Sequence, residues 1–147
     1  MIVIAHNIRS LHNVGSILRS ADAFDVECVY LTGFTGFPPR AEIAKTALGA
    51  EDRVVWKQSS NVLDVIHDLR NRDYRVVALE NGIHAEPIAP LGNKVALILG
   101  NEVEGIEKDI LAVCDTAMEI PMPGRKRSLN VSVAAGIALF VLSQKTT

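Results

Sequence analysis

The sequence has few cysteines, no long apolar run and almost no excess charge, and each of these features argues against a class of protein. Cys28 and Cys114 stand alone, without a CxxC or Cys/His spacing, so we expect neither a metal site nor a disulfide framework. The longest apolar stretch, residues 131–142, is shorter than the ~18 residues that a membrane-spanning helix needs. The net charge of -2 argues against binding of nucleic acid through an extended basic surface, so any contact with nucleic acid must be local.

Common nucleotide-binding and hydrolase motifs are absent as well. Neither GxGxxG nor GxxxxGK[ST] occurs, the four histidines lack the spacing of a zinc helix, and no serine stands in a nucleophile elbow. We therefore expect neither metal-dependent nor triad hydrolysis. The start MIVIAHN has no basic segment before its apolar residues, so the sequence predicts no leader peptide and a soluble protein of the cytoplasm.

Short β-branched runs alternate with segments of helical spacing, which predicts an α/β fold with a mostly parallel sheet flanked by helices. The chain has 147 residues, of which 48% are hydrophobic, so we expect one domain over residues 1–147. Apolar stripes predict helices near residues 14–24 and 62–69. The predicted strands cover residues 2–5, 28–31, 53–56, 75–79, 95–99 and 116–120.

Three polar segments stand where an open α/β sheet would bind a ligand, at or near the ends of predicted strands. GNEVEG at 100–105 follows an apolar strand, and its glycines allow close approach of a backbone. An ordinary turn with Glu102 at a helix start explains this segment equally well. Asn13 and Arg19 belong to the second segment, where Asn13 as a helix cap and Arg19 as a solvated side chain are the simpler interpretation.

The third segment, RKRSLN at 125–130, runs directly into VSVAAGIALFVLSQ, which is apolar on every side of a helix. Polar groups at the start of a buried helix are held firmly and have free backbone N–H groups beside them. A helix that is apolar around its circumference needs cover on all sides, and a domain of this size has little interior to supply it. The sequence thus predicts a homodimer in which a partner subunit covers this helix.

Taken together, the three segments resemble a known family. Asn13 with Arg19, LILGNEVEGI at 97–106 and EIPMPGRKRSLNVSVAAGIALF at 119–140 are similar to the three signature motifs of the SpoU (TrmH-like) branch of the SPOUT RNA methyltransferases. The resemblance implies a SPOUT fold whose C-terminal segment threads a deep trefoil knot, an exception to the usual absence of knots. It also implies S-adenosyl-L-methionine as methyl donor, a homodimer packed through the knotted region and no metal.

The implied reaction is methylation of a ribose 2′-hydroxyl in RNA, with transfer RNA favoured over ribosomal RNA because no separate RNA-binding extension precedes the first strand. The resemblance implies catalytic roles for Arg19, Asn13, Glu102, Ser128 and Asn130. It implies cofactor contacts by Leu79, Gly100, Ile120 and Leu129. The candidates for RNA contact are Arg9, Arg40, Arg125, Lys126 and Arg127.

The role of Arg19 follows from the chemistry of its side chain. A guanidinium is effectively never neutral in proteins, so we expect Arg19 to bind a phosphate and stabilise the developing oxyanion rather than to take the proton. Glu102 is expected to orient Asn13 or a loop backbone. Two other functions stay open: a non-catalytic RNA-binding module with the same fold, and a methyltransferase acting on a base nitrogen.

Overall fold

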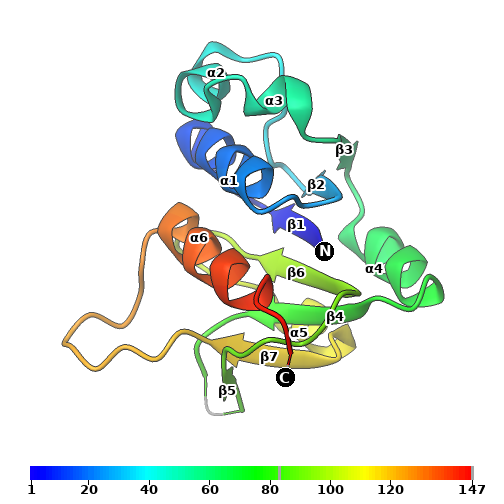
Figure 1. The fold of residues 1–147 in the computed structure, drawn as a ribbon, viewed down its shortest axis with the longest axis vertical. Helices are drawn as coiled ribbons and strands as arrows, with labels where there is room; N and C mark the ends of the chain where they lie inside the picture. The colour runs from blue at the N-terminus through cyan, green and yellow to red at the C-terminus, as the bar shows by residue number, and fades with distance from the viewer. Residues whose placement is uncertain (83, 147) are drawn as a thin grey trace.

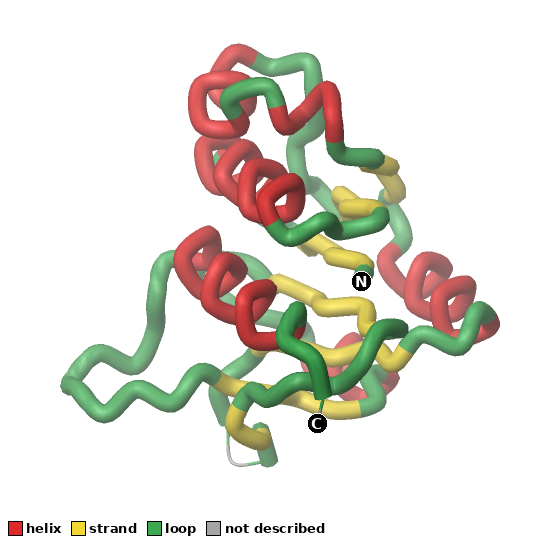
Figure 2. Tube along the Cα trace, viewed as in Figure 1, coloured by secondary structure: helices red, strands yellow, loops and turns green. Residues whose placement is uncertain are grey.

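The computed structural model of the protein describes residues 1–82 and 84–146 as a sheet with helices on both faces (Figure 1 and Figure 2). Its seven strands are β1 (Ile2–His6), β2 (Cys28–Thr32), β3 (Trp56–Ser59), β4 (Arg75–Leu79), β5 (Glu86–Pro87), β6 (Val95–Leu99) and β7 (Thr116–Glu119). The strand order is β3-β2-β1-β6-β4-β7-β5, and every neighbouring pair is parallel. This architecture confirms the predicted α/β class.

Six helices cover the sheet: α1 (Leu11–Ala23), α2 (Ala41–Ala47), α3 (Ala50–Arg53), α4 (Val62–Asn71), α5 (Lys108–Val113) and α6 (Val131–Leu142). Alternate residues of the buried strands face opposite layers, as the two-residue period of a strand requires. In β1, Val3 and Ala5 pack with residues of α1, α2 and α6, whereas Ile2 and Ile4 pack with residues of α4 and α5. The molecule thus has three layers, with α1 and α6 side by side on one face.

One predicted strand is misplaced. The sequence predicts a strand at 53–56, but residues 50–53 form α3 and the ladder with β2 begins only at Trp56, opposite Val29. Val54 is 7% exposed and packs in the helical layer, so its β-branched side chain is explained by core burial rather than by strand pairing. The short elements β5, α2 and α5 were not located from the sequence.

The strand order reverses between β1 and β6. On one side of this point the strands lie in the order β1, β2, β3, and on the other side they lie in the order β6, β4, β7, β5. Open parallel sheets bind ligands outside the carboxyl ends of their strands at such a point. The segment after β1 begins at Asn7 and the segment after β6 begins at Gly100, so both emerge at this edge.

The start of α1 lies just beyond this edge. Ser10 caps the helix, with its hydroxyl accepting a hydrogen bond of 3.2 Å from the Asn13 N–H. Asn13 is therefore not the cap, contrary to the simpler interpretation of that residue. The Asn13 side chain is therefore not used for capping and can bind a residue outside α1.

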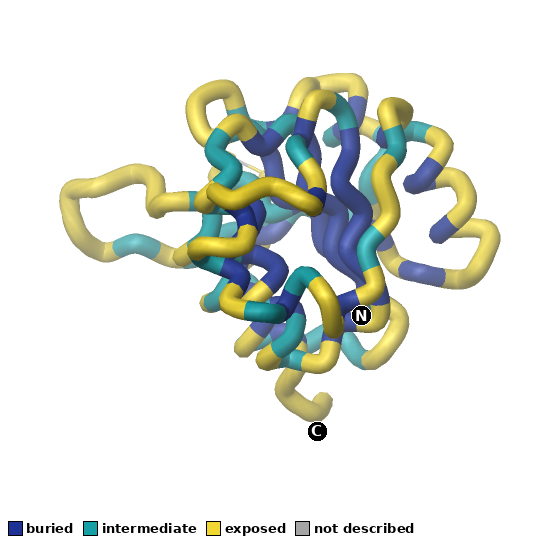
Figure 3. The backbone as a smooth tube through the Cα atoms, turned by 90° about the horizontal axis from the view of Figure 1, so that it is seen from above, coloured by how far each residue is buried: buried dark blue, intermediate teal, exposed yellow. Residues whose placement is uncertain are grey.

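The segment between β7 and α6 stands out from the body of the molecule (Figure 1) and is mostly exposed, in contrast to the buried centre of the sheet (Figure 3). It carries the basic run at residues 125–127. None of the helices in the described part of the chain is long and apolar enough to cross a membrane.

Candidate functional site

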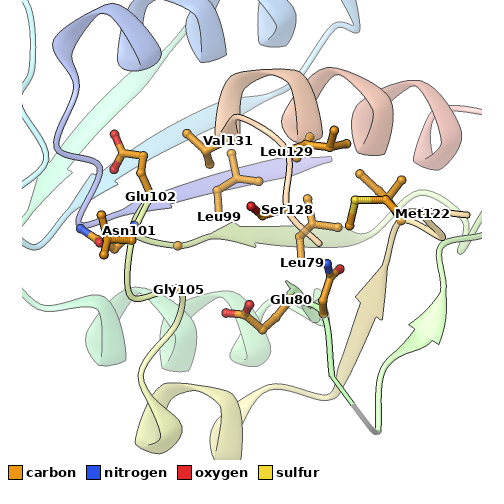
Figure 4. A pocket seen from close by; sticks show the side chains of 15 residues that line it. Leu79, Glu80, Leu99, Asn101, Glu102, Gly105, Met122, Ser128, Leu129 and Val131 are labelled. Carbon is orange, nitrogen blue, oxygen red and sulfur yellow. Dashed lines mark hydrogen bonds between the residues drawn. The ribbon is translucent and has the colours of Figure 1, made fainter. Parts of the chain in front are cut away.

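A pocket opens at the carboxyl ends of β4 and β6 (Figure 4). Three stretches of chain supply its walls: the end of β4, the segment after β6, and the segment that leads from β7 into α6. Its lining residues are Leu79, Glu80, Asn81, Leu99, Gly100, Asn101, Glu102, Val103, Gly105, Ile120, Met122, Ser128, Leu129, Val131 and Ala134. Apolar walls with a few polar groups at fixed places suit a flat heterocyclic ligand.

The segment after β6 is folded back on itself, which fixes its shape. The backbones of Asn101 and Gly105 exchange two hydrogen bonds of 2.9 and 3.0 Å, and the Asn101 side-chain oxygen accepts from the N–H groups of Val103 and Glu104. At Gly100, a Cβ would lie 2.7 Å from the carbonyl carbon of Gly105, so only glycine fits there. The tight turn explains why the sequence has glycine at both ends of this segment.

Glu80 is a pocket residue that the sequence analysis missed. One oxygen of its carboxylate accepts a hydrogen bond of 2.8 Å from the Ile106 N–H, and its side chain closes over Gly105. Glu80 lines the pocket beside Leu79, which the sequence analysis did select. The sequence feature that could have identified Glu80 is its position immediately after a predicted strand, at the carboxyl edge of a parallel sheet.

Glu102 joins the segment after β6 to the start of α1. Its carboxylate accepts from the N–H groups of Arg9 at 2.8 Å and Ser10 at 2.9 Å, and from the Asn13 amide at 3.2 Å. Partial burial raises the pKa of this carboxyl, but these hydrogen bonds outweigh burial and hold the pKa below its usual value. The expected proximity of Glu102 to Asn13 and to a loop backbone is present in the structure.

A second hollow adjoins the pocket and shares three residues with it, namely Glu102, Leu129 and Val131. Its remaining lining residues are Arg9, Ser10, Asn13 and Asn130. Asn130 caps α6, with its side-chain oxygen accepting from the N–H of Ser132 at 2.8 Å and from the hydroxyl of Ser132 at 2.6 Å. The fold therefore gathers most of the predicted polar and cofactor residues in two connected hollows.

Arg19 lies elsewhere. Its exposed side chain lines a groove between α1 and α2, together with Ser16, Ser20 and Lys45. Arg40 lies on another surface, next to Pro39 at the start of α2. Within one chain, the structure thus does not bring Arg19 or Arg40 into the pocket.

The basic run at residues 125–127 is exposed in the projecting segment. Its backbone is tied to the pocket wall, because the Asn81 side chain donates a hydrogen bond of 2.8 Å to the carbonyl of Arg127. Across residues 1–82 and 84–146, no three histidine, cysteine or acidic side chains gather as a metal site would require.

One face of α6 is uncovered in the single chain. Val133, Ile137 and Phe140 are 51%, 36% and 56% exposed, although each is apolar. Phe140 meets the edge of Phe24 with ring centroids 6.3 Å apart, so this face continues onto the end of α1. The groove that holds Arg19 also includes Phe24 and therefore borders the same apolar surface.

Comparisons with known proteins agree with this geometry. Residues 1–140 match the family described as the SpoU rRNA Methylase family. A 23S rRNA (guanosine-2'-O-)-methyltransferase, RlmB, of Xylella fastidiosa is 34% identical over 148 aligned positions, which cover 100% of this chain and 59% of that protein. The chain thus spans about 59% of the length of this curated relative.

Solved structures show the same fold. The TrmH/SpoU tRNA modifying enzyme of A. aeolicus superposes with a TM-score of 0.87 and 28% identity, over 97% of this chain and 73% of that one. An AdoMet-bound rRNA methyltransferase of Sinorhizobium meliloti superposes with a TM-score of 0.87 and 28% identity, over 95% of this chain and 54% of that one. These likenesses agree with the resemblance seen in the three motifs.

Proposed function

The chain belongs to the SpoU rRNA methylase family, and from this membership we propose that it is an S-adenosyl-L-methionine-dependent RNA methyltransferase that modifies a ribose 2′-hydroxyl. The observation that carries the proposal is the meeting of the three motif segments at two connected hollows on the carboxyl edge of the sheet. The pocket at the ends of β4 and β6 would hold the cofactor, and the adjoining hollow would receive the ribose.

The pocket residues fit the proposed cofactor. Leu79, Ile120 and Leu129 offer apolar contact for an adenine ring, and the backbone of Gly100 lines the same pocket. S-adenosyl-L-methionine, when bound, supplies a methyl group on a sulfonium. The carboxylate of Glu80 has one oxygen bound to the Ile106 N–H, which leaves the other able to accept from a hydroxyl or ammonium group of the cofactor.

The protein's part in the reaction is to position the 2′-oxygen and to stabilise charge. The cofactor would supply the methyl group, and residues of this chain would hold the ribose 2′-hydroxyl in line with it while the hydroxyl proton passes to water. Asn13 and Asn130 line the hollow in which this oxygen would lie, and Glu102 fixes Asn13. Ser128 lines the adjoining cofactor pocket, where its hydroxyl would contact the cofactor or the edge of the ribose.

Arg19 would serve the pocket of a second copy. Its groove borders the uncovered apolar face of α6, so a homodimer formed through that face would place Arg19 at the interface. There its guanidinium would bind an RNA phosphate and stabilise negative charge on the 2′-oxygen. The other cations proposed for RNA contact are Arg9, Arg40, Arg125, Lys126 and Arg127; contacts of this kind position a substrate without reading its sequence.

We also propose the C-terminal trefoil knot and a single methyltransferase domain over residues 1–147. The knot is implied by the resemblance to the SpoU family, and the chain path has the return crossing that a knot needs, since β7 lies beyond β4 whereas α6 packs against α1. A crystal structure with the chain traced from end to end would test it. An enzyme acting on RNA in this way would work in the cytoplasm and would need no metal.

The test is transfer of labelled methyl groups from S-adenosyl-L-methionine to small RNA and to ribosomal RNA, followed by analysis of the nucleosides. Transfer RNA is the expected substrate and ribosomal RNA is the substrate named for the relative RlmB, so both pools are included. A labelled 2′-O-methylnucleoside supports the proposal. A label on the base instead would show that the protein methylates a base nitrogen and would refute ribose methylation. Cofactor binding without transfer to either pool would favour a non-catalytic RNA-binding module.

A variant makes the test specific. Arg19→Ala should abolish methyl transfer and leave cofactor affinity unchanged, because the proposed partners of Arg19 are the RNA phosphate and the 2′-oxygen rather than the cofactor. Arg75→Ala is the matched control, since Arg75 is an exposed arginine at the first residue of β4, on the opposite edge of the sheet. Undiminished transfer by Arg19→Ala would remove this residue from the mechanism.

A further inference from the structure

The turn after β2 presents an aromatic ring to solvent at the same edge of the sheet as the pocket. Phe34 is 61% exposed, more than any other aromatic side chain in the described part of the chain. Burying a ring of this size is favourable, so a ring left in the open marks a surface that can gain from contact. The proposed function above does not use Phe34.

The turn that carries Phe34 is firmly held. The Phe34 N–H donates a hydrogen bond of 3.1 Å to the Asn7 side-chain oxygen, and the buried hydroxyl of Thr35 donates one of 2.9 Å to the Ala5 carbonyl. Gly33 has a φ of 63°, and a Cβ there would collide with the Asn7 side chain. A ring on a fixed turn loses little freedom when a ligand stacks on it, which favours binding.

The same hydrogen bonds tie this turn to the pocket. The carbonyl of Asn7 accepts a hydrogen bond of 2.8 Å from the side chain of Asn101, which lines the pocket. Strands β2, β1 and β6 are neighbours, and adjacent strands are ~4.8 Å apart, so the end of β2 lies about 10 Å from the end of β6. Phe34 is thus within reach of a nucleotide next to one that occupies the pocket.

One cation, Arg9, stands near the two sites, beside the carboxylates of Glu102 and Glu107. Arg9 follows β1, lies between these strand ends and is exposed on the rim of the hollow beside the pocket. In the part of the chain that the structure describes, its guanidinium takes part in no ion pair. The nearby carboxylate of Glu107 already accepts from the Asn7 amide at 2.9 Å and lies 3.2 Å from the His6 ring.

We propose that Phe34 is a stacking platform for the base of a nucleotide that flanks the target ribose, with Arg9 contacting the phosphate between them. A cation beside an exposed ring is the arrangement that binds single-stranded RNA, because every base has a face that can stack. This inference rests on the proposed function for the position of the target ribose. It predicts preference for an unpaired neighbour and little preference for its identity.

The experiment measures binding of a fluorescein-labelled single-stranded RNA of about 12 nucleotides and mixed sequence, by fluorescence anisotropy. Phe34→Ala should weaken binding about 5- to 100-fold, and Phe34→Leu should weaken it similarly because leucine keeps apolar contact but has no ring. Phe34→Trp should retain it. Val55→Ala is the control, since Val55 is also apolar and 56% exposed but precedes β3, at the opposite edge of the sheet.

Cofactor binding and methyl transfer by the same variants separate the two proposals. If the wild-type protein methylates RNA and Phe34→Ala does so with unchanged KM, the stacking site is overturned and the proposed function stands. If Phe34→Ala weakens RNA binding but neither it nor the wild-type protein transfers a methyl group, the stacking contact with RNA stands, whereas the proposed function and the placement of that contact beside a target ribose fail. Absence of binding by the wild-type protein, an equal loss in Val55→Ala, or a changed oligomeric mass in Phe34→Ala would overturn the stacking site.

Discussion

The hydrogen bonds of Glu102 give a prediction that joins stability to pH. Replacement by glutamine keeps the size of the side chain but turns one carboxylate oxygen into an N–H₂ donor. In the structure one oxygen accepts from Arg9, and the other accepts from Ser10 and Asn13. In Glu102→Gln, either orientation of the amide therefore places its N–H₂ group against an N–H donor, that of Arg9 or those of Ser10 and Asn13.

The size of the effect follows from these contacts. A hydrogen bond to a charged group contributes about 1.5–3 kcal/mol when buried, but Glu102 is exposed and water can replace part of each contact. We expect Glu102→Gln to lower the free energy of unfolding by about 1–2 kcal/mol at neutral pH. For a domain of this size that corresponds to a fall in Tm of about 2–8 °C.

The pH dependence has a definite sign. The pKa of Glu102 is lower in the folded protein than in the unfolded chain. Its contribution to the free energy of unfolding is therefore complete above the unfolded pKa of about 4.3. The contribution is lost as pH falls through the lower, folded pKa. The difference in Tm between wild type and Glu102→Gln should therefore shrink between neutral pH and about pH 3.

Thermal unfolding followed by circular dichroism at a series of pH values measures this difference. Glu104→Gln is the matched control: it also replaces a carboxylate in the segment after β6, but in the described part of the chain the Glu104 side chain makes no hydrogen bond or ion pair. Its Tm should follow wild type at every pH. Equal Tm values for wild type and Glu102→Gln at neutral pH, or a difference that does not change with pH, would refute the reasoning.

Three further predictions concern packing, reactivity and assembly. Gly15→Ala should cost about 1–3 kcal/mol of stability, because a Cβ there would collide with Thr46 and the backbone of α2, whereas Gly136→Ala, with 3.7 Å to its nearest neighbour, should not destabilise; urea unfolding compares them. Burial raises the pKa of the Cys114 thiol to about 11, so this thiol should react with Ellman's reagent at pH 8 far more slowly in the folded protein than in urea; equal rates would contradict its burial. Ile137→Glu should give a monomer by light scattering, since it places a charge on the uncovered face of α6; an unchanged mass would move the proposed dimer to another surface.

Local patterns in the sequence are enough to predict the layers of the fold and the segments of the site. Apolar residues at strand and helix spacing are a local signal, which is why β6, α4 and α6 can be located from the amino acids alone. The motif segments at 97–106 and 119–140 are also recognisable, because a tight turn and a helix start require particular residues at fixed places. The expected closeness of Glu102 and Asn13 came from the resemblance to the SpoU family, which implies that both residues belong to one site.

Which of these segments meet depends on the tertiary structure. Strand order is set by pairing between distant parts of the chain, and insertion of β6 between β1 and β4 brings Asn7 beside Asn101. The same order makes Glu80 a pocket residue, whereas the packing of α1 against α2 and α6 leaves Arg19 outside that pocket. Exposure is likewise a property of the whole fold: Phe34 is 61% exposed because no other part of the chain covers it, and that depends on how distant segments pack.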